Sequence, residues 1–360
     1  MKHNLQKTFF ILIIFIFLTS CISPIYDGDM DISEQQSVWQ YLKVYSIYED
    51  RLPDKCGSRT PEELFDIIND MFRGGRYTEY RLDKTLNNAA AALENRDNEC
   101  YNCVIFPITD STVFIRIPEF SDASEQFFKR NVIPLAGYPN IVIDLMDNGG
   151  GFMSVCDYII GEFLPFNSEY IQLEYREYDR IELKGRTVTW EKQRTANRNP
   201  KLLNKNIAIL MDNYSASASE ILISALKDKN DAHLIGRQTT GKGIGQLRIY
   251  RLGRKPLSIT SIKIKGLTNR TGDYHNKGIE PDKHDDKIWE DAMEQYPRYR
   301  DMRLRYLYYA VMYLEPSADF EEVTGVIAEK HSDGLLYKSH SLNKAAPVGA
   351  YYILEDPLNN

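Results

Sequence analysis

One stretch of the chain reads Ile207-Ala208-Ile209-Leu210-Met211-Asp212-Asn213-Tyr214-Ser215-Ala216-Ser217-Ala218-Ser219-Glu220-Ile221. It begins with a short apolar run that includes β-branched residues, which is typical of a buried strand in a mostly parallel sheet. Small and polar residues follow, and from Ser217 to about Lys229 the apolar side chains recur at helical spacing. The stretch therefore predicts a strand that turns into a helix, as in α/β folds.

The same alternation continues on both sides of this junction. Upstream, two β-branched runs predict buried strands, and a glycine turn and a helical pattern follow the second; downstream, further strands are predicted. In chain order these are strands at 113–117 and 141–145, the turn Gly149-Gly150-Gly151, a helix at 155–164, and strands around Ile235 and at 257–264. We therefore expect an α/β protein with a mixed or largely parallel sheet flanked by helices.

The patterns divide the chain into five segments. A small helical region precedes the core, and one of its helices has a clear start, with Thr60 as N-cap, Pro61 in the first turn and Glu63 closing a capping box. In the tail, helical patterns are interrupted by Pro316, and a last stretch at 335–354 suggests paired strands. The predicted segments are a leader at 1–20, a tether at 21–32, an N-terminal helical region at 33–103, a core at 104–285 and a helical and strand extension at 286–360.

The N-terminus has the features of a secretory leader. Lys2 and Lys7 precede a ten-residue apolar run at 9–18, which is too short to cross a bilayer as a helix. Leu18-Thr19-Ser20-Cys21 matches a bacterial lipobox, in which cleavage makes Cys21 the lipidated first residue; an ordinary signal peptide with an incidental cysteine is the alternative. We expect secretion across the inner membrane and lipid anchoring in the bacterial cell envelope, with the outer membrane favoured.

Composition argues against nucleic acid as a partner. The 360 residues carry a formal net charge of −7 and a pI near 5.5, without a basic footprint. Hydrophobic residues make up 43% of the chain, which is enough for a sizeable core.

Four cysteines remain after Cys21, and outside the cytosol they permit three disulfide pairings. They are Cys56, Cys100, Cys103 and Cys156. Cys100 and Cys103 have C-x-x-C spacing, but no second ligand pair stands at zinc spacing. A structural disulfide or free thiols are therefore favoured over a metal site.

Two segments contain the residue types needed for nucleophilic catalysis. Ser217 stands at the predicted helix start, next to unpaired backbone N–H groups, and Lys242 is framed by glycines in Thr239-Thr240-Gly241-Lys242-Gly243-Ile244-Gly245-Gln246. A lysine acts as a base only when neutral, which requires a desolvated pocket. Each also has a plain structural interpretation, Ser217 as a helix cap and Lys242 as a solvated loop residue. Residue types alone do not choose among Ser215, Ser217 and Ser219.

Taken together, the two segments resemble the active-site signature of the C-terminal-processing, or tail-specific, serine proteases. The similarity covers Ser215-Ala216-Ser217-Ala218-Ser219-Glu220-Ile221, Ala225-Leu226-Lys227-Asp228, Gly236 and Thr240-Gly241-Lys242-Gly243-x-x-Gln246 in one register. The resemblance implies that Ser217 is the nucleophile and Lys242, twenty-five positions later, its general base. It also implies that Gln246 orients the lysine amine and that Asp228 supports the site without taking part in the chemistry.

Two further blocks agree with this resemblance. They are Ile143-Asp144-Leu145-Met146-Asp147-Asn148-Gly149-Gly150-Gly151 and Lys277-Gly278-Ile279-Glu280-Pro281-Asp282. The resemblance implies an oxyanion hole formed by the backbone N–H of Gly150 or Gly151 together with that of Ala218. It covers roughly residues 112–285, and it implies a core of the ClpP/crotonase type with neither a metal nor an organic cofactor.

The chain departs from the family pattern in two places. Met146 stands where the family usually has arginine, so the support of the oxyanion loop is expected to differ. Many members carry a PDZ domain before the core. The 38 residues from Gly74 to Ser111 are fewer than the ~50 of an independent domain, so a full PDZ domain does not fit there.

We therefore expect a serine endopeptidase that hydrolyses polypeptides of the cell envelope by acyl transfer and is held at the membrane through Cys21. The alternative is a catalytically silent protease-fold lipoprotein that binds peptides or small apolar ligands. The complete set of Ser217, Lys242 and Gln246 favours the enzyme, because a binding protein has no use for a neutral lysine. A Ser-His-Asp triad is disfavoured, since none of the six histidines lies within the two segments that contain Ser217 and Lys242. The natural substrate and the oligomeric state stay open.

Overall fold

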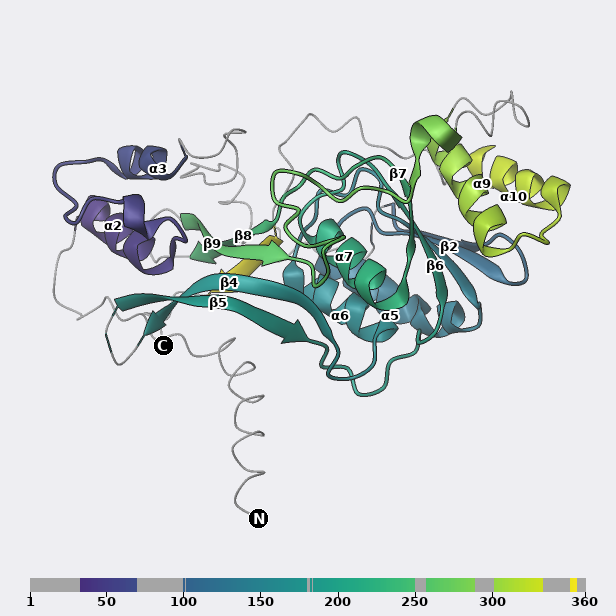
Figure 1. Ribbon diagram of the computed structural model, residues 1–360, viewed down its shortest axis with the longest axis horizontal. Coiled ribbons are helices and arrows are strands. Elements are labelled where there is room, and N and C mark those ends of the chain that lie inside the picture. The colour runs from purple at the N-terminus through teal and green to yellow at the C-terminus, as the bar shows by residue number, and fades with distance from the viewer. Residues whose placement is uncertain are drawn as a thin grey trace, which may run out of the picture.

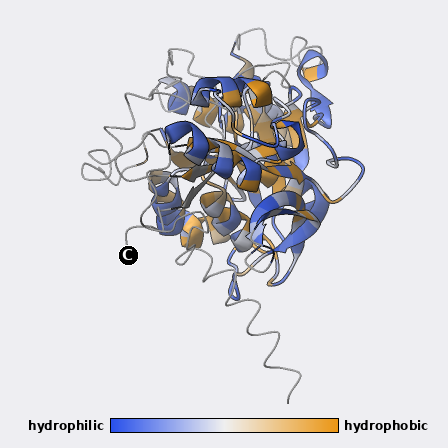
Figure 2. Cartoon of the chain, turned by 90° about the vertical axis from the view of Figure 1, so that its left-hand side faces the viewer, coloured by the Kyte–Doolittle hydropathy of each residue, from blue (hydrophilic) through white to orange (hydrophobic). Residues whose placement is uncertain are grey.

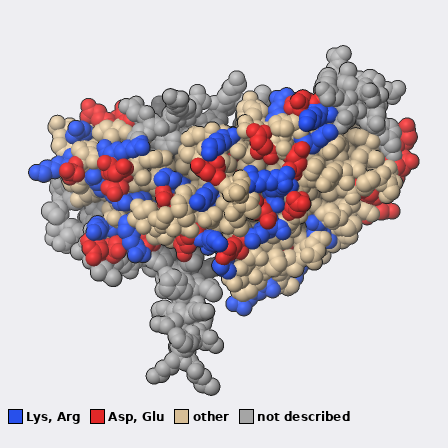
Figure 3. Space-filling model, in the orientation of Figure 1, with Lys and Arg blue, Asp and Glu red and all other residues tan. Residues whose placement is uncertain are grey.

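The computed structural model describes residues 33–69, 100, 102–179, 182, 184–249, 257–288, 301–332 and 350–354. The predicted leader, Cys21 and the tether lie outside these residues, as does the later part of the N-terminal helical region. Within the described ranges, no helix combines the length and the apolar character that crossing a membrane would require. Lys and Arg are interspersed with Asp and Glu on the face seen in Figure 3, without a broad area of one sign.

The core contains a six-stranded sheet in the order β1-β2-β3-β6-β7-β10. All neighbouring strands are parallel except β1, which pairs antiparallel with β2. The strands are β1 (Val104–Pro107), β2 (Thr112–Arg116), β3 (Asn140–Asp144), β6 (Asn206–Met211), β7 (His233–Gly236) and β10 (Lys283–His284). The runs predicted at 113–117, 141–145, 207–210 and around Ile235 all fall in this sheet, which confirms the α/β prediction.

Helices cover both faces of this sheet (Figure 1). Ile115 and Ile143 pack against the helices of one face, and Phe114 and Val142 pack against those of the other. Successive side chains of a strand point to opposite faces, so a strand covered on both sides needs a continuous apolar run. The first face carries α5 (Asp122–Ala136), α6 (Met153–Phe163) and α7 (Ala218–Asn230), and the second carries α9 (Met302–Leu314) and α10 (Phe320–Ser332).

A second sheet has five strands in the order β11-β8-β9-β4-β5. β11 runs parallel to β8, and the other pairs are antiparallel. The strands are β4 (Glu169–Asp179), β5 (Lys184–Arg194), β8 (Ile244–Ile249), β9 (Leu257–Lys265) and β11 (Ala350–Leu354). β9 matches the strand predicted at 257–264, and β11 lies within the stretch expected to form strands; β4 and β5 had not been predicted.

The N-terminal helices pack on this second sheet, at the left of Figure 1. They are α2 (Glu34–Tyr45), the short 3-10 helix η1 (Glu49–Arg51) and α3 (Pro61–Asn69). The predicted capping box of α3 is confirmed, because the backbone N–H of Thr60 donates to Glu63 Oε2 at 2.7 Å and that of Glu63 donates to Thr60 Oγ1 at 3.2 Å. Figure 2 shows the apolar residues gathered inside, between helices and sheets.

Candidate active site

Ser217 occupies the sharp turn between β6 and α7, where it is the N-cap residue of the helix. Its backbone has φ 59° and ψ −114°, a conformation that residues with a side chain seldom adopt and that stores strain. Gly150 lies directly against it, since a Cβ added to Gly150 would be 2.8 Å from the Cβ of Ser217. The structure thus brings Ser217 and the glycine turn together, and only glycine fits at position 150.

The three serines of this junction differ in the use of their hydroxyl groups. Oγ of Ser215 donates to the carbonyl of Leu145 at 2.8 Å, and Oγ of Ser219 donates to the carbonyl of Asn148 at 2.8 Å. A hydroxyl group has one hydrogen to donate, so both are engaged in holding the loop after β3. These contacts give Ser215 and Ser219 a scaffold role.

The carboxylate of Glu220 joins the loop of Ser217 to the loop of Lys242. Oε2 accepts from the backbone N–H of Ser217 at 2.9 Å and from that of Lys242 at 2.7 Å. Oε1 accepts from Thr239 Oγ1 and from the N–H of Gly241, both at 2.6 Å. Burial raises the pKa of this fully buried carboxyl group, and the four hydrogen bonds oppose the rise. One side chain therefore sets the separation of the two loops.

Sequence reasoning did not place Glu220 among the site residues. The available signal was its position three residues after Ser217, which is the spacing of a capping box. The bond from the Ser217 N–H to Glu220 belongs to such a box. The contacts to Thr239 and Gly241 join residues about 20 positions apart, and no local pattern encodes them.

Lys242 and Gln246 belong to the second sheet. Lys242 lies two residues before β8 and Gln246 is the third residue of that strand, and each is 2% exposed. Gly241 has φ +82°, and a Cβ there would be 2.6 Å from the backbone nitrogen of Gly278, so the turn before Lys242 requires glycine. Nε2 of Gln246 has no hydrogen-bond partner within the described ranges. A buried amide in this state is uncommon and marks a position that can serve a functional partner.

The predicted oxyanion donors lie at the same turn. Ala218 is the first residue of α7, so its N–H lies in the first turn, where helix amides have no intrahelical partner. The N–H of Gly150 donates to Asn148 Oδ1 at 2.8 Å. Gly151 forms a parallel bridge with Phe120, whose backbone bonds to the residues on either side of it. The N–H of Gly151 therefore points away from Phe120, which favours Gly151 over Gly150 as the second donor.

Asp212, directly after β6, ties the loop after β3 to the loop before Ser217. Its Oδ1 accepts from the backbone N–H of Asp147 at 3.2 Å and from those of Tyr214 and Ser215, each at 3.0 Å. Burial and the neighbouring Asp147 raise the pKa of Asp212, and these amide donors oppose the rise. Asp212 therefore holds the two loops against each other.

Asp228 lies away from this constellation. It is eleven residues beyond Ser217, or about 16 Å along the axis of α7. Its Oδ2 accepts from the N–H of Leu267 at 2.8 Å and from Thr271 Oγ1 at 2.5 Å, and its Oδ1 accepts from Thr268 Oγ1 at 2.7 Å. Asp228 therefore supports the turn after β9, and not the reacting groups.

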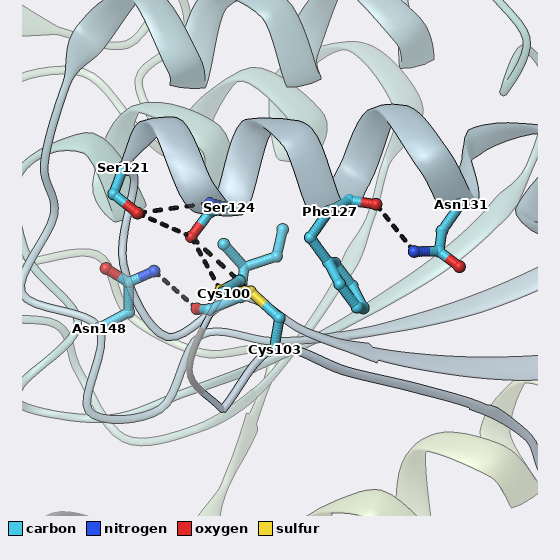
Figure 4. Close-up of a disulfide and its surroundings, with 8 residues drawn as sticks. Cys100, Cys103, Ser121, Ser124, Phe127, Asn131 and Asn148 are labelled. Carbon is cyan, nitrogen blue, oxygen red and sulfur yellow. Dashed lines mark hydrogen bonds between the residues drawn. A yellow bond between two sulfur atoms is a disulfide. The ribbon is translucent and has the colours of Figure 1, made fainter. Parts of the chain in front are cut away.

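Cys100 and Cys103 form a disulfide, whereas Cys56 and Cys156 are buried free thiols. Figure 4 shows the disulfide against the first turn of α5, where Ser124 Oγ lies 3.3 Å from Cys100 Sγ, with Asn148 nearby. Sγ of Cys156 donates to the carbonyl of Ala218 at 3.2 Å, and burial raises the pKa of this thiol. The prediction of a disulfide or free thiols in place of a metal site agrees with this arrangement.

A hollow of about 560 Å³ lies at the opposite edge of the six-stranded sheet. It is lined by Pro107, Ile108, Thr109, Asp110, Gly137, Tyr138, Glu322 and Val326. These residues surround the N-terminal ends of β2 and β3, whereas the loops around Ser217 follow the C-terminal ends of β3 and β6. The hollow is therefore separate from the candidate site.

Residues 111–284 match the model of peptidase family S41. This match covers a little under half of the chain. The three S41 blocks described above lie within the match, whereas α2, α3, α9 and α10 lie outside it. The resemblance to C-terminal-processing proteases is confirmed.

Two S41 relatives illustrate the extent of the likeness. A probable CtpA-like serine protease of Staphylococcus saprophyticus is 32% identical over 158 residues, which are 44% of this chain and 29% of that protein. The carboxy-terminal processing protease CtpB of Bacillus subtilis is 30% identical over 173 residues, which are 48% of this chain and 33% of that protein. The chain thus spans about a third of the length of these relatives.

A solved structure shows the same fold over a larger part of the chain. A lipoprotein from Streptococcus agalactiae superposes with a TM-score of 0.50 at 16% identity, over 75% of this chain and 98% of that one. At this identity the likeness concerns the fold alone.

Proposed function

We propose that this protein is a serine endopeptidase that cleaves polypeptides by acyl transfer, with Ser217 as the nucleophile and Lys242 as the general base. The observation that carries the proposal is the Glu220 carboxylate, which binds the backbone of both residues and so fixes their two loops together. The match of residues 111–284 to the model of peptidase family S41 supports the reaction class.

The chemistry follows from the roles of these groups. Oγ of Ser217 attacks the carbonyl carbon of the scissile bond while Nζ of Lys242 takes the hydroxyl proton. The N–H groups of Ala218 and Gly151 stabilise the negative charge on the carbonyl oxygen. The C–N bond then breaks as Lys242 delivers its proton to the leaving amine. Water, activated by Lys242, releases the acyl group and restores Ser217.

Burial supports Lys242 as the base. A side chain that is 2% exposed has lost most of its hydration, and loss of hydration favours the neutral amine over the ammonium ion. Only the neutral amine accepts a proton from a serine hydroxyl. Gln246, equally buried, offers an amide that can orient the amine.

We further propose that the protein acts on polypeptides of the cell envelope while anchored by lipid on Cys21. The leader pattern at 1–20 and the lipobox motif support this location. Cys21→Ala is expected to shift the protein from the membrane fraction to a soluble or unprocessed form, without changing catalysis by the purified domain. Equal membrane retention of this variant would point to another anchor.

The test of the activity combines a serine-reactive fluorophosphonate probe with hydrolysis of an unfolded protein. The wild type is expected to be labelled and to hydrolyse the substrate, and Ser217→Ala to do neither. Ser219→Ala is the matched control, and it should keep both properties because its hydroxyl serves the scaffold. A folded wild type that is not labelled would contradict the proposal and favour the silent binding protein. Labelling that persists in Ser217→Ala would contradict Ser217 as the nucleophile.

A further inference from the structure

One residue of α9 contacts the loop after β3, although α9 lies outside the part of the chain that matches the family. Arg303, the second residue of this helix, is 7% exposed. Its Nη2 lies 3.0 Å from Asp147 Oδ2 and 3.4 Å from the carbonyl oxygen of Met146. Its Nε lies 2.9 Å from Asp144 Oδ2. The guanidinium group therefore spans the segment 144–147.

This contact supplies a positive charge where the loop has none of its own. The resemblance to C-terminal-processing proteases implies an arginine at position 146, where this chain has methionine. Its side chain is 5% exposed and packs in the same apolar cluster as Leu304 and Leu307 of α9. The side chain of Met146 thus faces α9, and the guanidinium of Arg303 extends from α9 to the backbone of Met146.

The carboxylates around this guanidinium make it hard to replace. Asp144 is fully buried, and its other ionic neighbour is Arg116, whose Nε lies 3.7 Å from Asp144 Oδ2. Burial opposes the charge of Arg303, but Asp144 and Asp147 together raise its pKa above the ordinary value. Removing one member of a buried ion pair leaves the other charge without compensation, and this is strongly unfavourable.

The contact is linked to Ser217 through a short series of hydrogen bonds. Asp144 Oδ1 accepts from the N–H of Met146 at 2.9 Å. Two positions on, the side chain of Asn148 accepts from the N–H of Gly150 at 2.8 Å, and its carbonyl accepts from the N–H of Ala216 at 3.0 Å. Movement at 146–147 is therefore passed to Gly150, which packs on Ser217.

We infer that Arg303 is a positioning residue for the oxyanion loop, defined here as residues 145–151. By binding the carbonyl of Met146 and the carboxylates of Asp144 and Asp147, it holds this loop against Ser217 in place of the arginine that the loop lacks. The effect on rate rests on the proposed function, whereas the effect on the order of the loop does not.

The first experiment replaces Arg303 and measures both turnover and hydrogen exchange. Arg303→Met is expected to lower kcat on the order of 100-fold through misplacement of the oxyanion donors, with little change in KM. The backbone amides of residues 145–151 should exchange faster relative to the rest of the core. Arg305→Met is the matched control, because Arg305 lies about 200° further around the same helix. It should leave the exchange of the loop unchanged relative to the core.

Two further variants cover the case in which Arg303→Met does not fold. Arg303→Lys keeps the charge but loses the planar fork, and it should show a smaller loss of kcat and a smaller gain in exchange. The double variant Met146→Arg/Arg303→Met moves the guanidinium to the loop and should recover much of the lost kcat. If the double variant folds but does not recover kcat, the idea that Arg303 takes the place of an arginine at position 146 would be overturned.

The outcomes separate this inference from the proposed function. Unchanged loop exchange in folded Arg303 variants would overturn the positioning role, whatever their activity. A wild type without Ser217-dependent hydrolysis, together with faster loop exchange in the Arg303 variants, would contradict the protease and support the positioning role.

Discussion

The two sheets of this protein are built under different constraints. The six-stranded sheet is covered on both faces, and every residue of β2 and β3 is buried. The five-stranded sheet ends in the hairpin β4–β5, and no residue of β5 is buried. Ser217 follows a strand of the first sheet and Lys242 precedes a strand of the second. The candidate catalytic pair therefore belongs to neither sheet alone.

Helix α7 connects the two sheets through a carboxylate at each end. Glu220, in its first turn, binds the loop that carries Lys242. Asp228, near its last turn, binds the turn after β9. The well-packed sheet supplies a rigid base, while the relative position of the reacting groups depends on a few buried polar bonds between the sheets.

The largest effect is expected when either member of the pair is removed. Ser217→Ala and Lys242→Ala should each lower kcat/KM on an unfolded protein by on the order of 10³-fold or more, and the double variant should be little worse, because residues that act as one unit are not additive. Losses that multiply in the double variant would show that the two residues act independently.

Lys242→Arg should be as inactive as Lys242→Ala, since a guanidinium group stays protonated. For the wild type, kcat/KM should rise with pH along a single ionisation below the ~10.4 of a free lysine, because the neutral amine is the active form. An active arginine variant, or a pH profile that falls through the histidine range, would count against the pair.

Weakening the link between Glu220 and the loop of Lys242 should have the next largest effect. Glu220→Gln replaces one acceptor oxygen by an NH₂ group that faces two donors, and each unsatisfied buried donor costs about 1–3 kcal/mol. We expect a lower melting temperature and a loss of kcat on the order of 100-fold through misplacement of Lys242.

Glu162→Gln is the matched control for this change. Glu162 is 6% exposed and its Oε2 accepts from the N–H of Lys201 at 3.0 Å, a bond that a glutamine carbonyl can keep. It should remain close to the wild type in kcat. If both variants lost activity equally, the role of Glu220 as a link between the loops would be wrong.

Weakening the link between Asp228 and the turn after β9 should affect the free energy of unfolding more than the rate of hydrolysis. In Asp228→Asn one oxygen of the group that holds Leu267, Thr268 and Thr271 becomes a donor. Thermal unfolding should show a loss of about 1–3 kcal/mol, while kcat/KM changes by only a few-fold because the residue is remote from Ser217. A loss of rate as large as that of Glu220→Gln would restore Asp228 to the site.

The smallest effect concerns a third link, between α6 and β4. Tyr170 donates to Asp157 Oδ1 at 2.8 Å, and burial raises the pKa of Asp157 from 3.8 to about 7, against the opposing effect of this bond. Between these values the folded state holds a proton that the unfolded state has lost, so the free energy of unfolding should fall as pH rises from about 4 to about 7. Urea titrations of Asp157→Asn should lack this part of the dependence; an unchanged profile would assign it to other groups.

The same comparison explains how much could be predicted from the sequence. β2, β3 and β6 lie between two layers of helices, so their apolar runs are unmistakable, and Ser217 and Lys242 lie in local motifs. β4 and β5 mix charged and apolar residues because much of their surface is exposed, and their pattern was missed. The bond from Arg303 to Met146 joins residues 157 positions apart, and such contacts leave no trace in local spacing.

The helices on the second face of the six-stranded sheet have a consequence for biosynthesis. A chain that grows from its N-terminus completes β2, β3 and β6 well before α9 and α10 exist. Until those helices arrive, Phe114, Val142 and Leu210 have no cover on that face, and such surfaces invite aggregation. We expect a chain that stops after residue 300 to bind a hydrophobic dye strongly, and weak binding would show that the sheet closes without them. The residues of the candidate catalytic pair are thus synthesised long before the layer that completes the sheet beneath them.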